Sequence, residues 1–428
     1  MRELYLDHAA TTPVRDEVAL AMEEARRGAF ANPSSPHAAG RRAKAVLEDC
    51  RDQIRTLIGA TGRHDRLVFT SGATEANRLA VLGMAAAIPG AGGTTGVAAC
   101  SARDHTSCVA AVTELAARQG AQRWETVRAP LTPAGTLDPV WLRHWAAAAA
   151  ARPHLLCMTL VCGQSGTVEP FAEPFAEDET LPWDPAAGSW ERDLRVHVDA
   201  TQAVGLFDVS FAQLASSAQL PAATLTLAPH KFGGPRGIGG LVVRSDIPLE
   251  PLAAGPQEQG LRGGTEPVVL AVGFARALDL AVAARRAEAE RLTSLRDRLE
   301  TGLMARAREV GVEAHVINGG GMGGTGPRRA PHISTLAFSV LNAGAESGRG
   351  IDRQALVMAA DLEGVCIATG TACASGSSEP APALAAMGLP KPVLESAVRI
   401  SVGRDTTPAV IDEALARLGR VLARMATR

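Results

Sequence analysis

The architecture of this chain is most directly inferred from the segment Ala228-Pro-His-Lys-Phe-Gly-Gly-Pro-Arg-Gly237. It follows Thr224–Ala228, an apolar stretch with the composition of a buried strand, and it continues into a glycine-rich turn. Lys231 is therefore expected where a strand gives way to a loop. A lysine in that position is able to form a Schiff base with an aldehyde cofactor, and the alternative is a purely structural role.

A second strand end carries a carboxylate. The segment Val196-His-Val-Asp-Ala-Thr-Gln202 ends an alternating strand at Asp199. In open α/β sheets, ligands bind outside the carboxyl ends of the strands, so Asp199 and Lys231 are expected at one edge. There the carboxylate would pair with a protonated pyridine nitrogen. Taken alone, Asp199 would more simply cap the following turn.

Helix and strand patterns alternate through the first 245 residues, which favours a mostly parallel sheet covered by helices. In this part we predict helices and strands in the order Arg41–Ile58 (helix), Leu67–Thr70 (strand), Glu75–Ala87 (helix), and then the strands Thr95–Cys100, Leu155–Val161, Leu194–Asp199, Thr224–Ala228 and Gly239–Val243.

The pattern changes near residue 263, where we place a domain boundary. Residues 16–262 would form a large cofactor-binding domain, and residues 1–15 with 263–428 a small α+β domain. The small domain is expected to hold one or two long helices over Pro267–Val310, followed by strand His332–Val340, helix Asp352–Leu362, strands Val365–Ala368 and Val398–Val402, and helix Pro408–Met425. Residues 171–192 and 318–326 resemble insertions, either surface elaborations or partner contacts.

Composition excludes several classes of protein. The net charge is −2 and there is no polybasic stripe, which argues against nucleic-acid binding. No apolar run approaches the roughly 20 residues of a membrane helix, and the first residues lack the apolar region of a secretory signal. The seven cysteines are dispersed and lack zinc-ligand spacing, so we expect a reduced, cytoplasmic protein without bound metal.

Two further segments could serve a cofactor. In Phe69-Thr-Ser-Gly-Ala-Thr74, a strand passes through a small-residue turn into a helix, and the free N–H groups there could seat a phosphate. Plain N-capping by Ser71 or Thr74 is the alternative. His105 follows another strand and could stack on an aromatic cofactor and move protons, although a lone histidine is more often structural.

Cys373 and Arg399 are the remaining candidates. Cys373 lies in Ala368-Thr-Gly-Thr-Ala-Cys-Ala-Ser-Gly-Ser-Ser378, among small residues typical of a loop rather than the apolar neighbours of a buried cysteine. Arg399 is a cation inside a strand-like segment and needs an anionic partner. A substrate carboxylate held bidentately would serve.

Taken together, these segments resemble the cysteine desulfurases of the class V aminotransferase family, which are fold-type I pyridoxal-phosphate enzymes. The resemblance runs from residue 4 to about residue 412. It implies a large domain with a mainly parallel seven-stranded sheet and a smaller α+β domain. The matching motifs are Leu6-Asp-His-Ala-Ala-Thr-Thr-Pro13, Asn32-Pro-Ser-Ser-Pro-His37, Thr70-Ser-Gly-Ala-Thr-Glu75, His197-Val-Asp-Ala-Thr-Gln202, His230-Lys231, Arg262-Gly-Gly-Thr265 and Gly370-Thr-Ala-Cys-Ala-Ser375.

The resemblance also implies roles for single residues. Lys231 would hold pyridoxal 5'-phosphate, Asp199 would pair with its ring nitrogen, and Gln202 would bond its ring hydroxyl. Arg399 and Asn32 would hold the substrate carboxylate, with Cys373 as nucleophile. The other cofactor contacts would come from Ala73, Thr74, His230, His105 (stacked on the ring and catalytic) and Thr265, the last from the second subunit of a homodimer.

The implied reaction converts L-cysteine to L-alanine and leaves a persulfide on Cys373 for a protein acceptor, either an iron–sulfur scaffold or a sulfur relay protein, with an optimum at neutral to mildly alkaline pH. The alternatives are another pyridoxal-phosphate enzyme (a C–S or selenocysteine lyase, or an aminotransferase) and a non-catalytic scaffold. Two positions depart from the family pattern. Ala228 replaces a serine and Gly163 an asparagine, which predicts weaker cofactor binding or slower turnover by about 1–3 kcal/mol.

Overall fold

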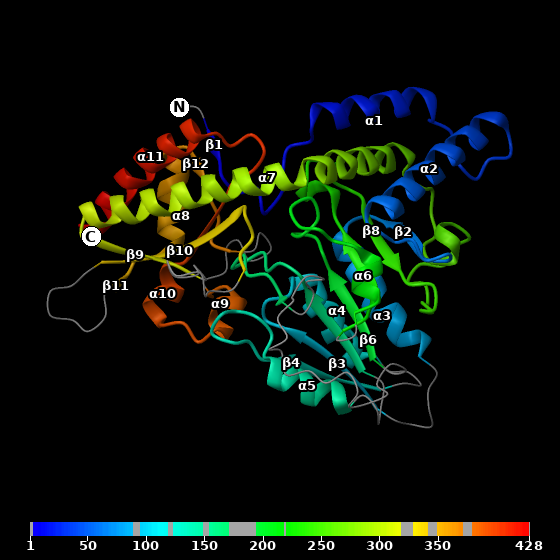
Figure 1. Cartoon of the computed structure of the whole chain (residues 1–428), viewed down its shortest axis with the longest axis horizontal. Coiled ribbons are helices and arrows are strands. Elements are labelled where there is room, and N and C mark those ends of the chain that lie inside the picture. The colour runs from blue at the N-terminus through cyan, green and yellow to red at the C-terminus, as the bar shows by residue number, and fades with distance from the viewer. Residues whose placement is uncertain are drawn as a thin grey trace.

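The computed structural model describes residues 3–88, 95–118, 123–148, 154–170, 194–217, 220–317, 328–340, 349–370 and 379–427 (Figure 1). Both predicted insertions, 171–192 and 318–326, lie outside the described residues, as does Cys373. In the part of the chain that is described, no helix is long and apolar enough to cross a membrane.

A seven-stranded sheet organises the larger part of the fold, in the strand order β2-β8-β7-β6-β5-β3-β4. Only β8 runs antiparallel to its neighbours, and the other strand pairs are parallel. The predicted mainly parallel sheet is therefore confirmed. The strands are β2 (Arg66–Thr70), β3 (Gly96–Ser101), β4 (Trp124–Ala129), β5 (His154–Thr159), β6 (Leu194–Asp199), β7 (Ala222–Leu227) and β8 (Gly239–Val243).

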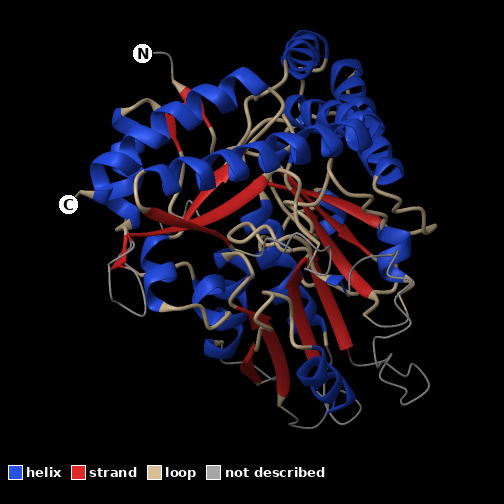
Figure 2. Ribbon diagram, turned by 60° about the vertical axis from the view of Figure 1, so that its left-hand side comes forward, coloured by secondary structure: helices blue, strands red, loops and turns tan. Residues whose placement is uncertain are grey.

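Helices cover both faces of this sheet (Figure 2). Along β2 the side chains alternate between two cores, because Leu67 and Phe69 join one and Val68 the other. The strands β3, β5, β7 and β8 are buried throughout, which explains their nearly continuous apolar sequences. The α-helices described between residues 16 and 215 are α1 (Asp16–Gly28), α2 (Ala38–Leu57), α3 (Ala73–Ala87), α4 (Thr106–Ala117), α5 (Pro139–Ala147) and α6 (Phe211–Ala215).

A smaller α+β unit packs around an antiparallel sheet with β10 at its centre. The first strand, β1 (Leu4–Tyr5), returns to this unit and pairs in parallel with β12 (Val365–Cys366). Its other elements are β9 (Val312–Val316), β10 (Ile333–Val340), β11 (Arg349–Gly350), β13 (Val398–Ser401), α8 (Arg353–Leu362), α9 (Pro382–Ala386), α10 (Lys391–Ser396) and α11 (Pro408–Ala426).

One long helix, α7 (Val268–Glu309), runs from the large unit to the small one (Figure 1). Its first half packs in the core of the large sheet, through Phe274 and Leu278. Its second half packs in the core of the small unit, through Leu295 and Leu299. The two cores thus divide α7 between them, and the domain boundary that we placed near residue 263 stays a proposal.

The sheet brings its functional residues to one edge. Asp199 is the last residue of β6, and the 3-10 helix η5 (Pro229–Lys231) follows the neighbouring strand β7. The helices α3 and α4 begin just after β2 and β3, which run in the same direction. The carboxyl ends of these strands therefore share an edge, where ligands of open α/β sheets bind.

Leu299 tests the role of α7 in the second core. Its side chain is 0% exposed, so Leu299→Ala leaves a cavity that we expect to lower the free energy of unfolding by about 2–5 kcal/mol. Leu362→Ala is the matched control, because that side chain is 86% exposed and its removal should change stability by less than about 0.5 kcal/mol. Urea denaturation measures both. Equal effects of the two substitutions would contradict the assignment of α7 to this core.

Candidate active site

The N-terminal segment holds the lysine in place. The Lys231 Nζ donates to the carbonyl oxygens of Ala9 at 2.7 Å and Ala10 at 2.9 Å. The backbone N–H and the hydroxyl of Thr12 both donate to the carbonyl of His230. The amine is thus aimed by backbone carbonyls, which orient it without neutralising it.

Asp199 lies in a buried hydrogen-bond network. Its side chain is 2% exposed. Its Oδ1 accepts from the backbone N–H of Thr201 at 2.9 Å, as in the turn that we considered, and its Oδ2 accepts from Asn77 Nδ2 at 3.0 Å. Asn77 also donates to Ser107 Oγ at 2.9 Å, and its Oδ1 contacts His197 Nε2 at 3.0 Å. The carboxylate is therefore held in one orientation from two sides.

The charge state of His197 follows from its contacts. Asn77 Oδ1 only accepts, so Nε2 of His197 carries the proton, and Nδ1 accepts from the hydroxyl of Thr224 at 2.8 Å. Burial lowers the pKa of His197 to about 4, which keeps the ring neutral. The sequence analysis did not single out Asn77. Its one available signal was an amide among the polar residues of the first two turns, before the helix continues with apolar residues.

Two buried thiols lie against this network. Cys108, Cys157 and His197 offer ligand atoms within 4.8 Å of one another. Both ring nitrogens of His197 already have hydrogen-bond partners, and burial raises the pKa of Cys157 to about 12, so that thiol stays protonated. The Cys108 thiol is oriented toward Asp199 Oδ2 at 3.9 Å. The cluster is therefore arranged to support Asp199 rather than to ligate a metal.

His105 caps the first turn of α4. Its Nδ1 accepts from the backbone N–H of Ser107 at 3.2 Å and lies 2.7 Å from the Ser107 hydroxyl. Burial lowers the pKa of His105, the negative charge of Asp199 opposes this effect, and the charge of Lys231 adds to it. Hydrogen bonds through Ser107 and Asn77 connect His105 to Asp199, so His105 lies at the same strand edge. His105 therefore has the structural role that we considered as the alternative, because it caps α4. The same position also brings its ring to the candidate site.

The start of α3 has open backbone donors. No side chain of the described residues caps this helix, so the alternative that we considered, capping by Ser71 or Thr74, is not found. Glu75 Oε2 accepts from the Ser71 N–H at 2.6 Å, and Arg262 pairs with Glu75 at 2.6 Å. Thr74 is exposed. The remaining N–H groups of the first turn, which begins at Ala73, are available to an anion.

His230 faces the N-terminal segment. Its Nδ1 lies 3.2 Å from the hydroxyl of Thr11. Burial, and then the charges of Lys231 and Arg236, lower its pKa to about 4. The ring is therefore neutral at pH 7, and it would contribute to phosphate binding as a hydrogen-bond group rather than as a cation.

Arg399 has an anionic partner within the chain. Its Nη2 donates to Asp7 Oδ1 at 2.7 Å, and its Nη1 donates to the carbonyl of Gly163 at 2.8 Å. The anionic partner that this buried cation was expected to need is therefore present within the chain, as Asp7. The sequence analysis missed Asp7 even though it lies in the first motif. Binding of a substrate carboxylate by Arg399 stays a prediction.

The two departures from the family pattern occupy different environments. A Cβ on Gly163 would lie 3.4 Å from Gln202 Nε2, an ordinary contact, so a side chain fits there. Gln202 itself donates to the carbonyl of Ala9 at 2.8 Å and contacts His332 Nε2 at 3.1 Å. Ala228 is completely buried, directly before η5.

Asn32 and Thr265 lie apart from this group. Both are exposed. A small pocket is lined by their sequence neighbours, among them Ser34, Gln257 and Glu266. A role for Asn32 at the substrate carboxylate and for Thr265 in the partner's site stays a prediction.

Cys373 lies outside the described residues, but both flanks of its segment are fixed. On one side, Ala368 and Arg399 exchange two backbone hydrogen bonds, of 3.0 and 2.7 Å. On the other side, the N–H of Ala383 donates to Gln164 Oε1 at 2.9 Å. The segment that carries Cys373 therefore begins beside Arg399 and ends beside Gln164, the residue that follows Gly163.

The sequence profile of the class V aminotransferases matches residues 4–413. The chain belongs to the class V aminotransferase family. Within this family it is similar to the cysteine desulfurase IscS of Dictyoglomus turgidum, with 31% identity over 100% of this chain and 96% of the relative. It is also similar to a cysteine desulfurase of Cereibacter sphaeroides, with 33% identity over 97% of this chain and 94% of the relative.

A solved structure supports the same fold for this family member. The NifS-like protein of Rickettsia africae superposes with a TM-score of 0.75 at 22% identity, covering 98% of this chain and 99% of that one. The superposition covers nearly all of both chains, so the two share the same fold.

The buried histidines predict acid sensitivity of the protein without cofactor. In the unfolded chain they take up protons as the pH falls through about 6.5, whereas folded His197 and His230 resist protonation down to about 4. The free energy of unfolding should therefore fall as the pH falls from about 6.5 toward 4. Replacing His230 by Gln should flatten this dependence.

Urea denaturation at several pH values between 7.5 and 4.5 measures the effect. His315→Gln is the matched control, because the side chain of His315 is 41% exposed. An unchanged pH slope in His230→Gln, equal to that of the control, would contradict the neutral, buried state of His230.

Proposed function

We propose that the chain is a pyridoxal-phosphate-dependent cysteine desulfurase, which converts L-cysteine to L-alanine and keeps the sulfur as a persulfide on Cys373. The observation that supports this most strongly is the position of the two residues. Asp199 ends β6, and Lys231 follows the end of the adjacent strand β7. The flanks of the Cys373 segment, anchored at Arg399 and Gln164, add the second half of the argument.

The residues at the strand edge fit pyridoxal phosphate. Asp199 is a buried carboxylate with a fixed orientation, as a partner of a protonated pyridine nitrogen requires. The uncapped start of α3 offers backbone N–H groups to a phosphate. When bound, the cofactor supplies an electron sink for the carbon that carries the substrate amino group. We assign the remaining contacts to Gln202, His105, His230, Thr74 and, across a homodimer, Thr265.

Different residues of the chain then bind the substrate, transfer the proton and attack the sulfur. Arg399 binds the substrate carboxylate in place of, or together with, its present partner Asp7, with Asn32 as a second candidate contact. The Lys231 amine, aimed by two carbonyls, takes the proton from the α-carbon. The Cys373 thiolate attacks the substrate sulfur. An S–S bond forms, the C–S bond breaks, and its electron pair stays on the β-carbon, which takes up a proton. Lys231 returns its proton to the α-carbon, and alanine is released.

Chain connectivity supports the role of Cys373. Gly370 is the last described residue before it, and three residues span at most about 10 Å. Since Ala368 is bonded to Arg399, a substrate whose carboxylate lies at Arg399 is within reach of the thiol.

The persulfide requires an acceptor. We propose a protein acceptor, an iron–sulfur scaffold or a sulfur relay protein. We also propose a homodimer and a cytoplasmic location. The cysteines support only the location, because the six that are described are all free and five of them are buried.

Mass spectrometry of the cofactor-loaded protein tests this function. Brief exposure to L-cysteine should add sulfur to the peptide that contains Cys373 and release an equivalent amount of alanine, and Cys373→Ala should lose both. Cys366→Ala is the matched control, because Cys366 lies on β12 and should not be needed. Alanine formed without sulfur on Cys373 would instead indicate a lyase that releases sulfur directly.

Replacing Gly163 is expected to increase the affinity for the cofactor or the substrate. Gly163→Asn places an amide beside Gln202, where there is room for its Cβ, and a polar partner for the cofactor or substrate should improve affinity by about 1–3 kcal/mol. Spectral titration of the protein with pyridoxal phosphate measures the cofactor part, and the KM for cysteine the substrate part. Ala228→Ser is the companion variant. If both variants leave affinity and rate unchanged, the two departures have no functional cost.

A further inference from the structure

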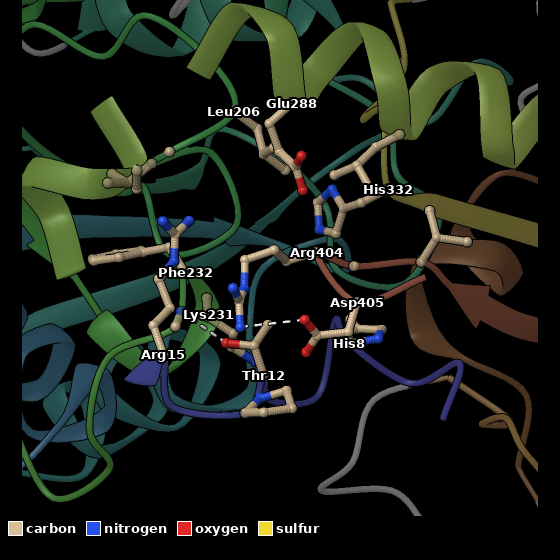
Figure 3. Close-up of a pocket in the computed structure, with 18 residues that line it drawn as sticks. His8, Thr12, Arg15, Leu206, Lys231, Phe232, Glu288, His332, Arg404 and Asp405 are labelled. Carbon is tan, nitrogen blue, oxygen red and sulfur yellow. Dashed lines mark hydrogen bonds and ion pairs between the residues drawn. The ribbon is translucent and has the colours of Figure 1, made fainter. Parts of the chain in front are cut away.

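A second cavity lies where the two cores meet (Figure 3). Its empty volume is about 570 Å³, including the mouth that is open to solvent. Of the residues to which we assign cofactor contacts, only Lys231 lines it. The N-terminal segment whose Ala9 and Ala10 carbonyls hold the lysine amine also contributes His8 and Thr12 to the wall. The cavity therefore adjoins the strand-edge site and shares Lys231 with it, but our inference does not depend on the desulfurase reaction.

One cation in the cavity wall has no anion. Arg15 makes no side-chain hydrogen bond or ion pair with the described residues, and its Nε is buried without a partner. The two carboxylates that line the cavity are already engaged, because Asp405 pairs with Arg404 at 3.2 Å and Glu288 pairs with Arg291 at 2.9 Å. Burial and then the charge of Arg404 lower the pKa of Arg15, and Glu17, Glu288 and Asp405 oppose this effect without contacting the guanidinium. A partly buried guanidinium that no carboxylate contacts favours an anionic ligand.

The rest of the wall is mostly apolar. Leu206 and Phe232 come from the large unit, Val402 from the small unit, and Leu292 from α7. His332 adds a buried acceptor, because its Nε2 hydrogen bond to Gln202 leaves Nδ1 unprotonated and without a partner. The apolar wall and the guanidinium of Arg15 fit a ligand that has a hydrocarbon body with one anionic end, whereas the unpaired acceptor of His332 favours a donor and not the anion.

We propose that this cavity is a binding site for a small aliphatic carboxylate. Its carboxylate pairs with Arg15, and its hydrocarbon part packs on Leu206, Leu292 and the neighbouring apolar wall.

The position of the site gives such a ligand a structural effect. Ala281 lines the cavity from the half of α7 that packs in the first core, and Leu292 lines it from the half that packs in the second. A bound carboxylate contacts both halves, and thereby stabilises the two cores in their present arrangement.

Isothermal titration of the cofactor-loaded protein with sodium hexanoate tests the proposal. We expect saturable binding of one hexanoate per chain, and at least tenfold weaker binding of hexylamine and hexan-1-ol, which keep the hydrocarbon part without the negative charge. Arg15→Gln should weaken hexanoate binding at least tenfold, and Arg15→Lys, which keeps the charge, should weaken it less.

Arg27→Gln is the matched control, because Arg27 lies on α1 with a side chain that is 74% exposed and should not affect binding. Urea denaturation checks that each variant is folded. Loss of the Arg15 side chain removes no observed hydrogen bond, so folding should be retained. The proposal is overturned by unchanged hexanoate affinity in Arg15→Gln, by hexylamine binding as tightly as hexanoate, or by the absence of saturable binding to the unsubstituted protein.

Discussion

The parallel pairing of β6 with β7 is the constraint on which the rest of the site depends. Asp199 pairs with Thr226 in this register, so the carboxylate lies beside the end of β7, just before the turn that carries Lys231. The proposed cofactor site requires both Asp199 and Lys231. The strand pairing brings a fixed carboxylate and an amine to the same edge, and the adjacent helix starts add His105 and the open N–H groups of α3.

Polar groups behind this edge keep it in position. The chain of contacts from Thr224 through His197 and Asn77 to Asp199 is buried and fully paired, so the carboxylate has little freedom to turn. On the other side, the N-terminal segment connects the lysine to the small unit, because Asp7 of the same segment pairs with Arg399. The helix α7 completes the connection by entering both cores. The first residues of the chain thus join Arg399, the proposed substrate contact, to Lys231, the proposed cofactor contact.

Much of this arrangement follows from the sequence. The strand ends at Asp199 and at Lys231 are predictable because apolar runs stop there and small or polar residues follow. The single long helix is predictable only in outline, since periodicity does not show whether the charged stretch after Ala281 interrupts it. Contacts between distant residues escape this kind of reasoning. The partner of Arg399 is Asp7, far away in sequence, and Asn77 supports Asp199 from a different helix. Both depend on the tertiary fold, which local patterns do not encode.

The claim that Lys231 and Asp199 together form the cofactor site is tested most directly by chemical trapping. The protein contains three lysines, Lys44, Lys231 and Lys391, so one reduction experiment distinguishes them. After incubation with pyridoxal phosphate and reduction with borohydride, peptide mapping should find the adduct on Lys231, with markedly less in Asp199→Asn. An adduct on Lys44 or Lys391, or equal labelling of all three, would contradict the account.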